Sequence, residues 1–369
     1  MDTHDPNNFA TQLSYKLASR SRHVCVFLGA GASRACGLPD LSTLTAKVLE
    51  NLSEEDRTTF QAEIGTGNLE SGLSRLRRVA ALLNDKQELN GLTKARAKLL
   101  DRVVCGKIAG ELGLDGADLG PMKMLAAWAG RSRYAKPVEI FTVNYDLLME
   151  TAFESQKVPY FDGFLGTMRA NFHTELVENS GEDQLPNFFV RLWKLHGSLN
   201  WLSLDSDGIS SRQIVRVGAR LEDKDVAAIY PSDEKYEESR RVPFLVLQDR
   251  FRRSLNEPET LAIISGYSFG DSHLNELIYE AAGRRERSEF VAFVFGEIPD
   301  ALAEWAGHTP NLQVISAKEA IIGGIRAAWI APANPVSVWS DDHLNLSDFR
   351  YLAQYLGRIS KDKDLEDHE

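Results

Sequence analysis

VCVFLGAGAS, the stretch from Val24 to Ser33, joins five consecutive apolar residues to a glycine-rich turn. A short apolar run that ends in glycine is typical of a strand buried on both faces of a parallel sheet. Glycines let the backbone turn sharply, and the helix that follows points its N-terminal amides at an anion, usually a pyrophosphate. The third glycine of the dinucleotide-binding fingerprint is missing, because Arg34 follows Ser33. The stretch is therefore also compatible with a simple strand-to-helix turn.

Apolar runs of the same kind recur along the chain. They are Val138–Val143, Phe188–Leu195, Val226–Tyr230, Leu261–Ser265, Val291–Phe295 and Leu312–Ile315. Helical patterns lie between several of them, namely Leu41–Leu52, Tyr145–Gln156 and His273–Ala282. Because strands alternate with helices, the sequence predicts an α/β fold with a parallel sheet and right-handed crossovers.

Residues from about Ser53 to Ala135 interrupt this alternation with helix formers and no convincing strand. We predict an inserted helical module over residues 53–135 and a sheet-containing domain built from residues 1–52 and 136–330. Residues 331–369 are expected to form a linker, a helix and a charged, disordered tail that begins at Lys361. The polar stretch Asp162–Pro186 is expected to be a loop or a small helical cap.

Composition narrows the class of protein. The chain has 42 Lys and Arg against 53 Asp and Glu, a net charge of −11, which disfavours direct binding of nucleic acid. No segment has the roughly 20 apolar residues that span a bilayer, and the polar N-terminus does not resemble a secretory signal. The cysteines, Cys25, Cys36 and Cys105, predict neither a disulfide framework nor a four-cysteine zinc site. We expect a cytoplasmic protein without a metal.

Two strand ends carry the residues that we assign to catalysis. Asn144 follows the run Val138–Val143, and His196 follows Phe188–Leu195. Ligands bind beyond the carboxyl ends of strands in open α/β sheets. A neutral amide suits the orientation of a sugar or a water beside a cationic leaving group, and histidine suits proton transfer near neutral pH. As a strand-end amide, Asn144 is expected to contribute little to stability, and Asp146 is also compatible with a helix cap.

Two further turns have small or polar residues in positions that favour a ligand. Gly37–Asp40 precedes a predicted helix, which Asp40 is also suited to cap. Ser265–Asp271 ends another strand, where small and hydroxyl residues suit a ribose or a phosphate.

Taken in order, these motifs resemble the sirtuin family. The family pattern is matched by Gly29–Ser33, Gly37–Asp40, Asn144–Asp146, His196–Gly197 and Gly266–Ser268. The forms Asn-Tyr-Asp, Lys-Leu-His-Gly-Ser and Gly-Tyr-Ser-Phe-Gly-Asp are more similar to the bacterial sirtuin-like proteins of anti-phage defence than to the protein deacylases. No cysteine follows Cys105, so the four-cysteine zinc module of the deacylases is missing. Asp40 is also followed by Leu41 and Ser42 instead of the Phe-Arg of the deacylases.

The resemblance implies a Rossmann-like sheet that binds NAD as a substrate. It implies cofactor-binding roles for Gly29, Ala30, Gly31, Ser33, Asp40, Asp146, Gly266, Ser268 and Asp271. Asn144 is expected to position the ribose and the attacking water, and His196 to act as general base. The implied reaction is cleavage of the bond between nicotinamide and ribose through an oxocarbenium-like transition state. Its products are nicotinamide and ADP-ribose, or a cyclised ADP-ribose.

Other functions and partners stay open at this point. The enzymatic alternative is an NAD-dependent protein deacylase or ADP-ribosyltransferase, and the non-enzymatic one is a sensor that binds NAD or ADP-ribose. The resemblance also suggests a homo-oligomer or a HerA-type ATPase partner, since an unrestrained NAD hydrolase would drain the cell of cofactor. Two helices, one with Phe9, Leu13 and Leu17 and one with Phe349, Leu352 and Leu356, have an apolar face that packs either on the sheet or against another chain.

Overall fold

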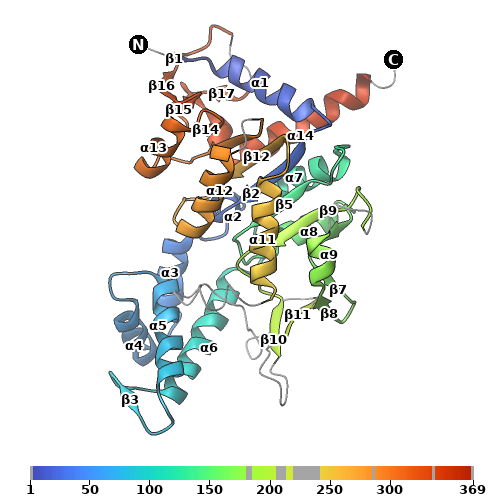
Figure 1. Ribbon diagram of the computed structural model, residues 1–369. Coiled ribbons are helices and arrows are strands. Elements are labelled where there is room, and N and C mark those ends of the chain that lie inside the picture. The colour runs from blue at the N-terminus through green and yellow to red at the C-terminus, as the bar shows by residue number, and fades with distance from the viewer. Residues whose placement is uncertain are drawn as a thin grey trace.

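The computed structural model describes residues 3–179, 185–204, 213–218, 242–284, 287–334 and 337–366. The predicted strand Val226–Tyr230 lies outside these residues. Figure 1 shows both ends of the chain at one end of the molecule and a group of helices, α3 to α6, at the other.

The centre of the fold is a ten-stranded sheet in the order β1-β16-β15-β14-β13-β12-β2-β5-β9-β6. The strands from β14 to β6 run parallel. They are β14 (Leu312–Ile315), β13 (Glu289–Phe293), β12 (Thr260–Ser265), β2 (His23–Leu28), β5 (Glu139–Thr142), β9 (Val190–Lys194) and β6 (Tyr160–Phe161). Numbered along the chain, β9-β5-β2-β12-β13-β14 follow the order 3-2-1-4-5-6 of a doubly wound Rossmann sheet. The predicted α/β fold is confirmed.

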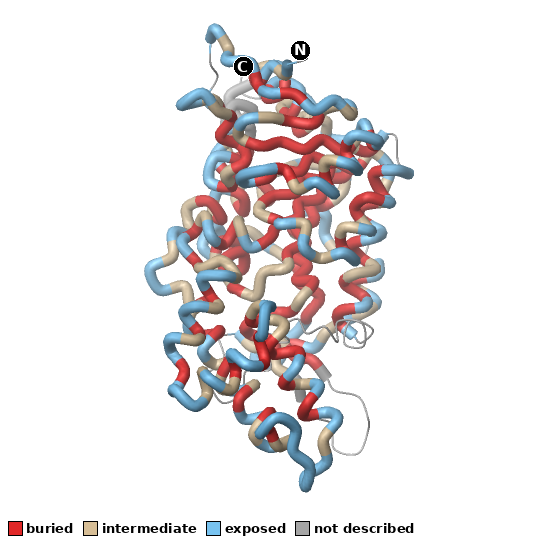
Figure 2. Tube along the Cα trace, turned by 90° about the vertical axis from the view of Figure 1, so that its left-hand side faces the viewer, coloured by how far each residue is buried: buried red, intermediate tan, exposed pale blue. Residues whose placement is uncertain are grey.

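Helices cover both faces of this sheet, and buried residues fill the middle of the molecule (Figure 2). β2 is buried along its whole length. Val24, Val26 and Leu28 pack on one face with α1 (Pro6–Ala18), α2 (Ala30–Ala35), α7 (Gly120–Arg131), α8 (Leu148–Ser155) and α14 (Phe349–Glu366). Cys25 and Phe27 pack on the other face with α9 (Thr174–Glu178), α11 (Phe244–Leu255), α12 (Ser272–Arg284) and α13 (Asp300–His308). The alternation of side chains along one strand therefore builds two cores.

The apolar faces of α1 and α14 are covered by the protein's own sheet. Leu13 and Leu352 are each only 1% exposed, and both lie in the core that contains β2. The alternative that these faces bind another chain is therefore wrong for both helices. α14 continues to Glu366 and thus extends into the tail that was predicted to begin at Lys361.

An antiparallel extension at one edge of the sheet was not predicted. β15 (Glu319–Ile322) and β16 (Ile325–Trp329) form a hairpin on β14, and β1 (Thr3–His4) pairs with β16. The hairpin turns at Gly323 and Gly324, whose φ angles of 61° and 83° favour glycine. The N-terminal residues thus complete the edge of the sheet.

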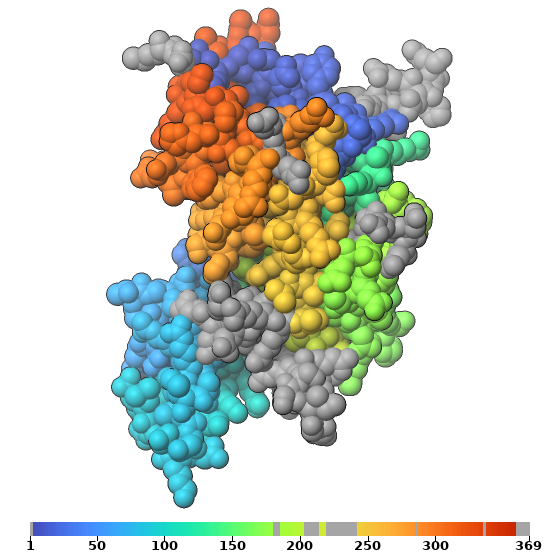
Figure 3. Space-filling view, in the orientation of Figure 1, coloured from blue at the N-terminus to red at the C-terminus, as the bar shows by residue number. Residues whose placement is uncertain are grey.

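The helical module has a separate core and forms a lobe at one end of the molecule (Figure 3). Its helices are α3 (Leu41–Glu50), α4 (Glu54–Ile64), α5 (Leu69–Leu82) and α6 (Lys94–Glu111), with a short hairpin of β3 (Glu88–Leu89) and β4 (Leu92–Thr93). α3 contributes Leu44 and Val48 to this core, whereas α7 packs on the large sheet. By packing, the module therefore extends from about Leu41 to Leu112, in place of the predicted limits 53–135.

The stretch predicted as a loop or small helical cap, Asp162–Pro186, contains the short helix α9 and also contributes two strands, β7 and β8, to a second sheet. This sheet has the order β10-β11-β8-β7. Its strands are β7 (Phe164–Leu165), β8 (Arg169–Phe172), β10 (Trp201–Leu204) and β11 (Gln213–Val217). A last short hairpin, β17 (Trp339–Ser340) and β18 (His343–Leu344), and the 3₁₀ helix η1 (Asn345–Ser347) lead into α14.

A buried ion pair fixes α11 against the amino ends of the strands. Arg250 donates two hydrogen bonds of 2.8 and 2.6 Å to the carboxylate of Glu139, and Trp193 Nε1 donates a third of 2.7 Å. His23 lies 3.3 Å from the same carboxylate and 2.9 Å from Ser254 Oγ. Burial lowers the pKa of His23, so this histidine is neutral in the folded protein.

None of the described helices is long and apolar enough to cross a membrane. All three cysteines are free and buried.

Candidate active site

Two glycine turns meet where the order of the sheet reverses, between β2 and β12. The amide of Gly29 donates to Ser265 O at 3.0 Å, and the amide of Gly31 donates to Gly266 O at 2.8 Å. A Cβ on Gly29 would lie 2.5 Å from Gly266 O, and one on Gly266 would lie 2.3 Å from the amide nitrogen of Ala32. Gly266 also has a φ of +65°. These glycines are therefore required for the two turns to touch.

The contact between the two turns reduces the number of free backbone amides with which the first turn could bind an anion. The amides of Gly29 and Gly31 already donate within the protein, and α2 is only six residues long. Ala30 is exposed at the start of α2. The role of these residues in binding a pyrophosphate stays a prediction, and the structure gives the two glycines a packing role that the sequence did not reveal.

A chain of hydrogen bonds links the turn after β2 to the loop after β5. Asn144 Nδ2 donates to Gly29 O at 2.9 Å and to Ser33 Oγ at 2.8 Å. Ser33 Oγ donates in turn to Asp146 Oδ2 at 2.5 Å, and Asp146 Oδ1 accepts from the amide of Leu148 at 3.1 Å. Asn144 is partly buried, where an exposed amide was predicted, and it donates two hydrogen bonds, so we expect it to contribute to stability.

The other predicted catalytic residue, His196, pairs with a residue from the loop after β12. His196 Nε2 lies 3.4 Å from Asp271 Oδ2, and the two side chains are 14% and 12% exposed. Asp271 Oδ1 also accepts from the amides of His273 and Leu274 and thereby caps α12. A carboxylate held in this way can fix the orientation of the imidazole.

Lys194 connects the His196 loop to the Asn144 loop, and sequence reasoning assigned it no role. Its side chain, 3% exposed, extends from the end of β9. Its ammonium group donates to the carbonyl oxygens of Tyr145 and Asp146 and lies 3.0 Å from Glu150 Oε1. The signal was present in the motif Lys-Leu-His-Gly-Ser, since a lysine that ends a buried strand needs a buried partner.

Two other predicted residues lie at the rim. Ser268 is exposed. Asp40 caps α3, accepting from the amide of Thr43 at 2.9 Å and from Ser42 Oγ at 2.8 Å, and these hydrogen bonds lower its pKa to about 2. Arg34 lies 3.4 Å from Asp40 and stacks over the ring of Phe295. The helix-capping interpretation of Asp40 thus has a geometric basis, and its contact with a ligand stays a prediction.

The donor set suits a ligand with hydroxyl groups and a cationic ring. Amide, hydroxyl and imidazole groups surround the junction of β2, β5, β9 and β12. Ser265 Oγ, at the end of β12, and Ser198 Oγ, in the loop after β9, are buried and have no hydrogen-bond partner among the described residues. Buried polar atoms without partners are uncommon and point to a bound water or ligand. The hydroxyl, amide and imidazole groups present therefore fit the ribose of a nucleotide.

The chain from β5 to β14 holds Asn144, His196 and Asp271, and this stretch is the one that matches a known family. Residues 138–315 match the family model of the SIR2-like domain. The match supports the sirtuin-like family and NAD-related chemistry for this protein. β2 and the Gly29–Ser33 turn precede the SIR2-like match, but β2 pairs with both β5 and β12 inside the same sheet. No curated protein matches the chain.

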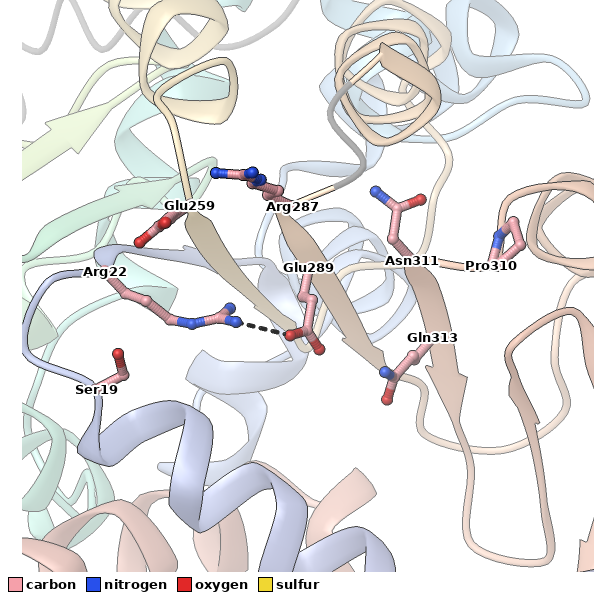
Figure 4. A pocket seen from close by; sticks show the side chains of 8 residues that line it. All are labelled: Ser19, Arg22, Glu259, Arg287, Glu289, Pro310, Asn311 and Gln313. Carbon is pink, nitrogen blue, oxygen red and sulfur yellow. Dashed lines mark hydrogen bonds and ion pairs between the residues drawn. The ribbon is translucent and has the colours of Figure 1, made fainter.

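A polar hollow of about 620 Å³ lies at the amino ends of the parallel strands, at the end of the sheet opposite to the candidate site (Figure 4). It is lined by Ser19, Arg22, Glu259, Arg287, Glu289, Pro310, Asn311 and Gln313. Arg22 pairs with Glu289 at 2.9 Å across it. None of the predicted site residues lines this hollow, which lies at the amino ends of β12, β13 and β14. Within the described ranges, no group of three His, Cys, Asp or Glu side chains is placed to hold a metal ion.

Proposed function

We propose that the protein is an NAD+ hydrolase that cleaves the bond between nicotinamide and ribose. The observation that carries the proposal is the pairing of two neighbouring loops in a SIR2-like stretch. One holds an amide, Asn144, fixed at two points, and the other holds an imidazole, His196, beside a carboxylate. Both loops lie at the carboxyl ends of the strands of a Rossmann sheet, where nucleotides bind.

Each residue has a defined task in this proposal. NAD+ supplies a leaving group whose departure neutralises the positive nicotinamide ring. Asn144 orients the ribose or the attacking water through its carbonyl oxygen, because its NH₂ group is already engaged with Gly29 and Ser33. His196 accepts a proton from the water, and Asp271 stabilises the resulting imidazolium. The products are nicotinamide, ADP-ribose and a proton.

From the resemblance to defence proteins, we also propose a role for this activity in the infected cell. Depletion of NAD would halt an infected host, and assembly with further copies of the chain or with a HerA-type ATPase would restrain the enzyme until infection. Since the apolar faces of α1 and α14 are buried, such contacts use other surfaces.

Chromatographic analysis of nicotinamide and ADP-ribose, after incubation of the purified protein with NAD+, tests the proposal. Release of both products without an acylated peptide supports the hydrolase. Release that requires an acylated peptide identifies a deacylase, and transfer of ADP-ribose to protein identifies a transferase. Tight binding of NAD+ without any release identifies a sensor. The last three outcomes each contradict the proposal. Because activity depends on the assembled state in this proposal, the mass of the particle is measured on the same sample.

A further inference from the structure

The ammonium group of Lys194 is fully used inside the protein. A lysine has three N–H donors, and this one has three acceptors, namely the carbonyl oxygens of Tyr145 and Asp146 and the carboxylate of Glu150. Lys194 and Glu150 are 3% and 11% exposed. A charge buried to this extent is retained only with well-placed partners.

These contacts join the two loops that carry the predicted catalytic residues. Lys194 ends β9, two positions before His196. Its acceptors Tyr145 and Asp146 directly follow Asn144, and Glu150 lies on the next helix, α8. Backbone hydrogen bonds from Leu195 to Thr142 O at 2.8 Å and from Leu199 to Tyr145 O at 3.0 Å run beside the lysine. The position of one loop is therefore set by the position of the other.

We propose that Lys194 is a positioning residue of the active site. It holds the Asn144 loop and the His196 loop in register so that the amide and the imidazole act on one substrate. Lys194 acts through these two residues and does not itself contact the substrate. The inference rests on the proposed function, since Asn144 and His196 have the roles given above.

A charged residue suits this task better than an apolar one. The carbonyl oxygens of Tyr145 and Asp146 point at the ammonium group, where a methionine offers them no donor. Loss of the lysine alone also leaves Glu150 as a buried carboxylate without its cation, which destabilises the fold. The informative variant therefore neutralises both partners, as Lys194→Met with Glu150→Gln.

The matched control is another buried ion pair that contacts the same sheet. Arg250 and Glu139 are 7% and 0% exposed, and Glu139 begins β5, five positions before Asn144. Glutamine at position 139 keeps an acceptor for Trp193 Nε1, the side chain that precedes Lys194. The double variant Arg250→Met with Glu139→Gln removes a comparable pair. Each protein is assayed for nicotinamide release at a temperature equally far below its own Tm, so that differences in global stability do not enter.

We expect the Lys194 double variant to lose about 10²-fold in kcat, because small displacements of positioned groups have effects of this size. Its KM for NAD+ and the kcat of the Arg250 double variant should change less than about threefold. Hydrogen–deuterium exchange without NAD+ gives a second measure. Residues 144–148 and 195–199 should exchange faster in the Lys194 variant, and the Arg250 variant should leave both segments unchanged.

Unchanged exchange in residues 144–148 overturns the inference. So does a kcat equal to that of the Arg250 variant. If the wild-type protein releases no nicotinamide, the proposed function fails, whereas the exchange experiment still decides whether Lys194 holds the loops. If the Lys194 double variant does not fold, Glu150→Gln alone is measured in the same way, and unchanged exchange in that variant also overturns the inference.

Discussion

Ser33 Oγ donates a hydrogen bond of 2.5 Å to Asp146 Oδ2, although the two residues are 113 positions apart in the chain. The same hydroxyl accepts from Asn144 Nδ2. A serine in the turn after β2 therefore connects the amide and the carboxylate of the Asn-x-Asp motif. The link explains why a hydroxyl residue follows the glycines of this turn, since an alanine there would leave a buried carboxylate without one of its donors.

Replacement of Ser33 by alanine should both destabilise the protein and reduce turnover. The variant removes the hydroxyl donor from Asp146 Oδ2, whereas Oδ1 keeps the amide of Leu148, and we expect the free energy of unfolding to fall by about 1–3 kcal/mol. Urea unfolding and nicotinamide release are measured on the same preparation. Ser14→Ala, which removes a hydrogen bond to Tyr355 far from the site, is the control and should keep full turnover. Full turnover in Ser33→Ala would show that the link has no catalytic role.

Asn144→Ala should abolish nicotinamide release at a moderate cost in stability. Removal of the amide takes a donor from Gly29 O and from Ser33 Oγ, so we expect a loss of about 1–2 kcal/mol on unfolding. Circular dichroism and urea titration establish the folded fraction before the assay. Asn311→Ala, which loses a hydrogen bond to Ser288 O at the opposite edge, should retain turnover. A folded Asn144→Ala protein with wild-type turnover would exclude Asn144 from the reaction.

His196→Ala should lower turnover by about 10²- to 10⁴-fold while NAD+ binding persists, because a general base acts on the chemical step. Asp271→Asn should lower turnover less. If Asp271 acts through His196, the double variant should be no slower than His196→Ala alone. Independent, multiplicative effects of the two substitutions in kcat measurements would show that Asp271 has a separate role, such as the predicted contact with the cofactor.

The buried His23 should make stability depend on pH. Its pKa is lowered by burial, so below about pH 6.5 the unfolded chain takes up a proton that the folded protein does not. Stability from this residue is therefore present at higher pH and is lost as the pH falls, by up to about 1.4 kcal/mol per pH unit. Urea unfolding of wild type and His23→Gln between pH 5 and 8 checks this. Parallel pH profiles for the two proteins would contradict the prediction.

Much of the central sheet could be predicted because its strands are buried on both faces. The run Val24–Leu28 has no polar residue and belongs to a strand without an exposed position. The hairpin of β15 and β16 was missed because Arg326 and its neighbours alternate in burial, although Gly323-Gly324 between two apolar stretches is a recognised hairpin signal. The sequence could not predict that α3 packs in the core of the helical module, because an apolar helix face does not show which core it joins.

The sequence predicted that the site residues lie at the ends of buried strands, but it did not predict which of these residues contact each other. Asn144 and His196 were chosen because each follows a buried strand, and the structure places both at the same edge of the sheet. The pairing of His196 with Asp271 and of Ser33 with Asp146 depends on loop geometry over long separations in sequence. The glycines at positions 29 and 266 were attributed to ligand approach, whereas the structure shows that they also let two turns touch.

Leu199 follows the His196 loop but lies in the core of the helical module, where it is 2% exposed, and Tyr145 packs against the same core. A shortened protein therefore cannot be made by cutting out residues 41–112, because the cut would uncover an apolar side chain next to each of the loops that carry Asn144 and His196. Among related sequences, we expect the positions of the module that face the two loops to vary differently from those on its outer surface. Substitutions inside the module at positions facing Leu199 should covary with that residue, while the outer surface of the module is free to diverge.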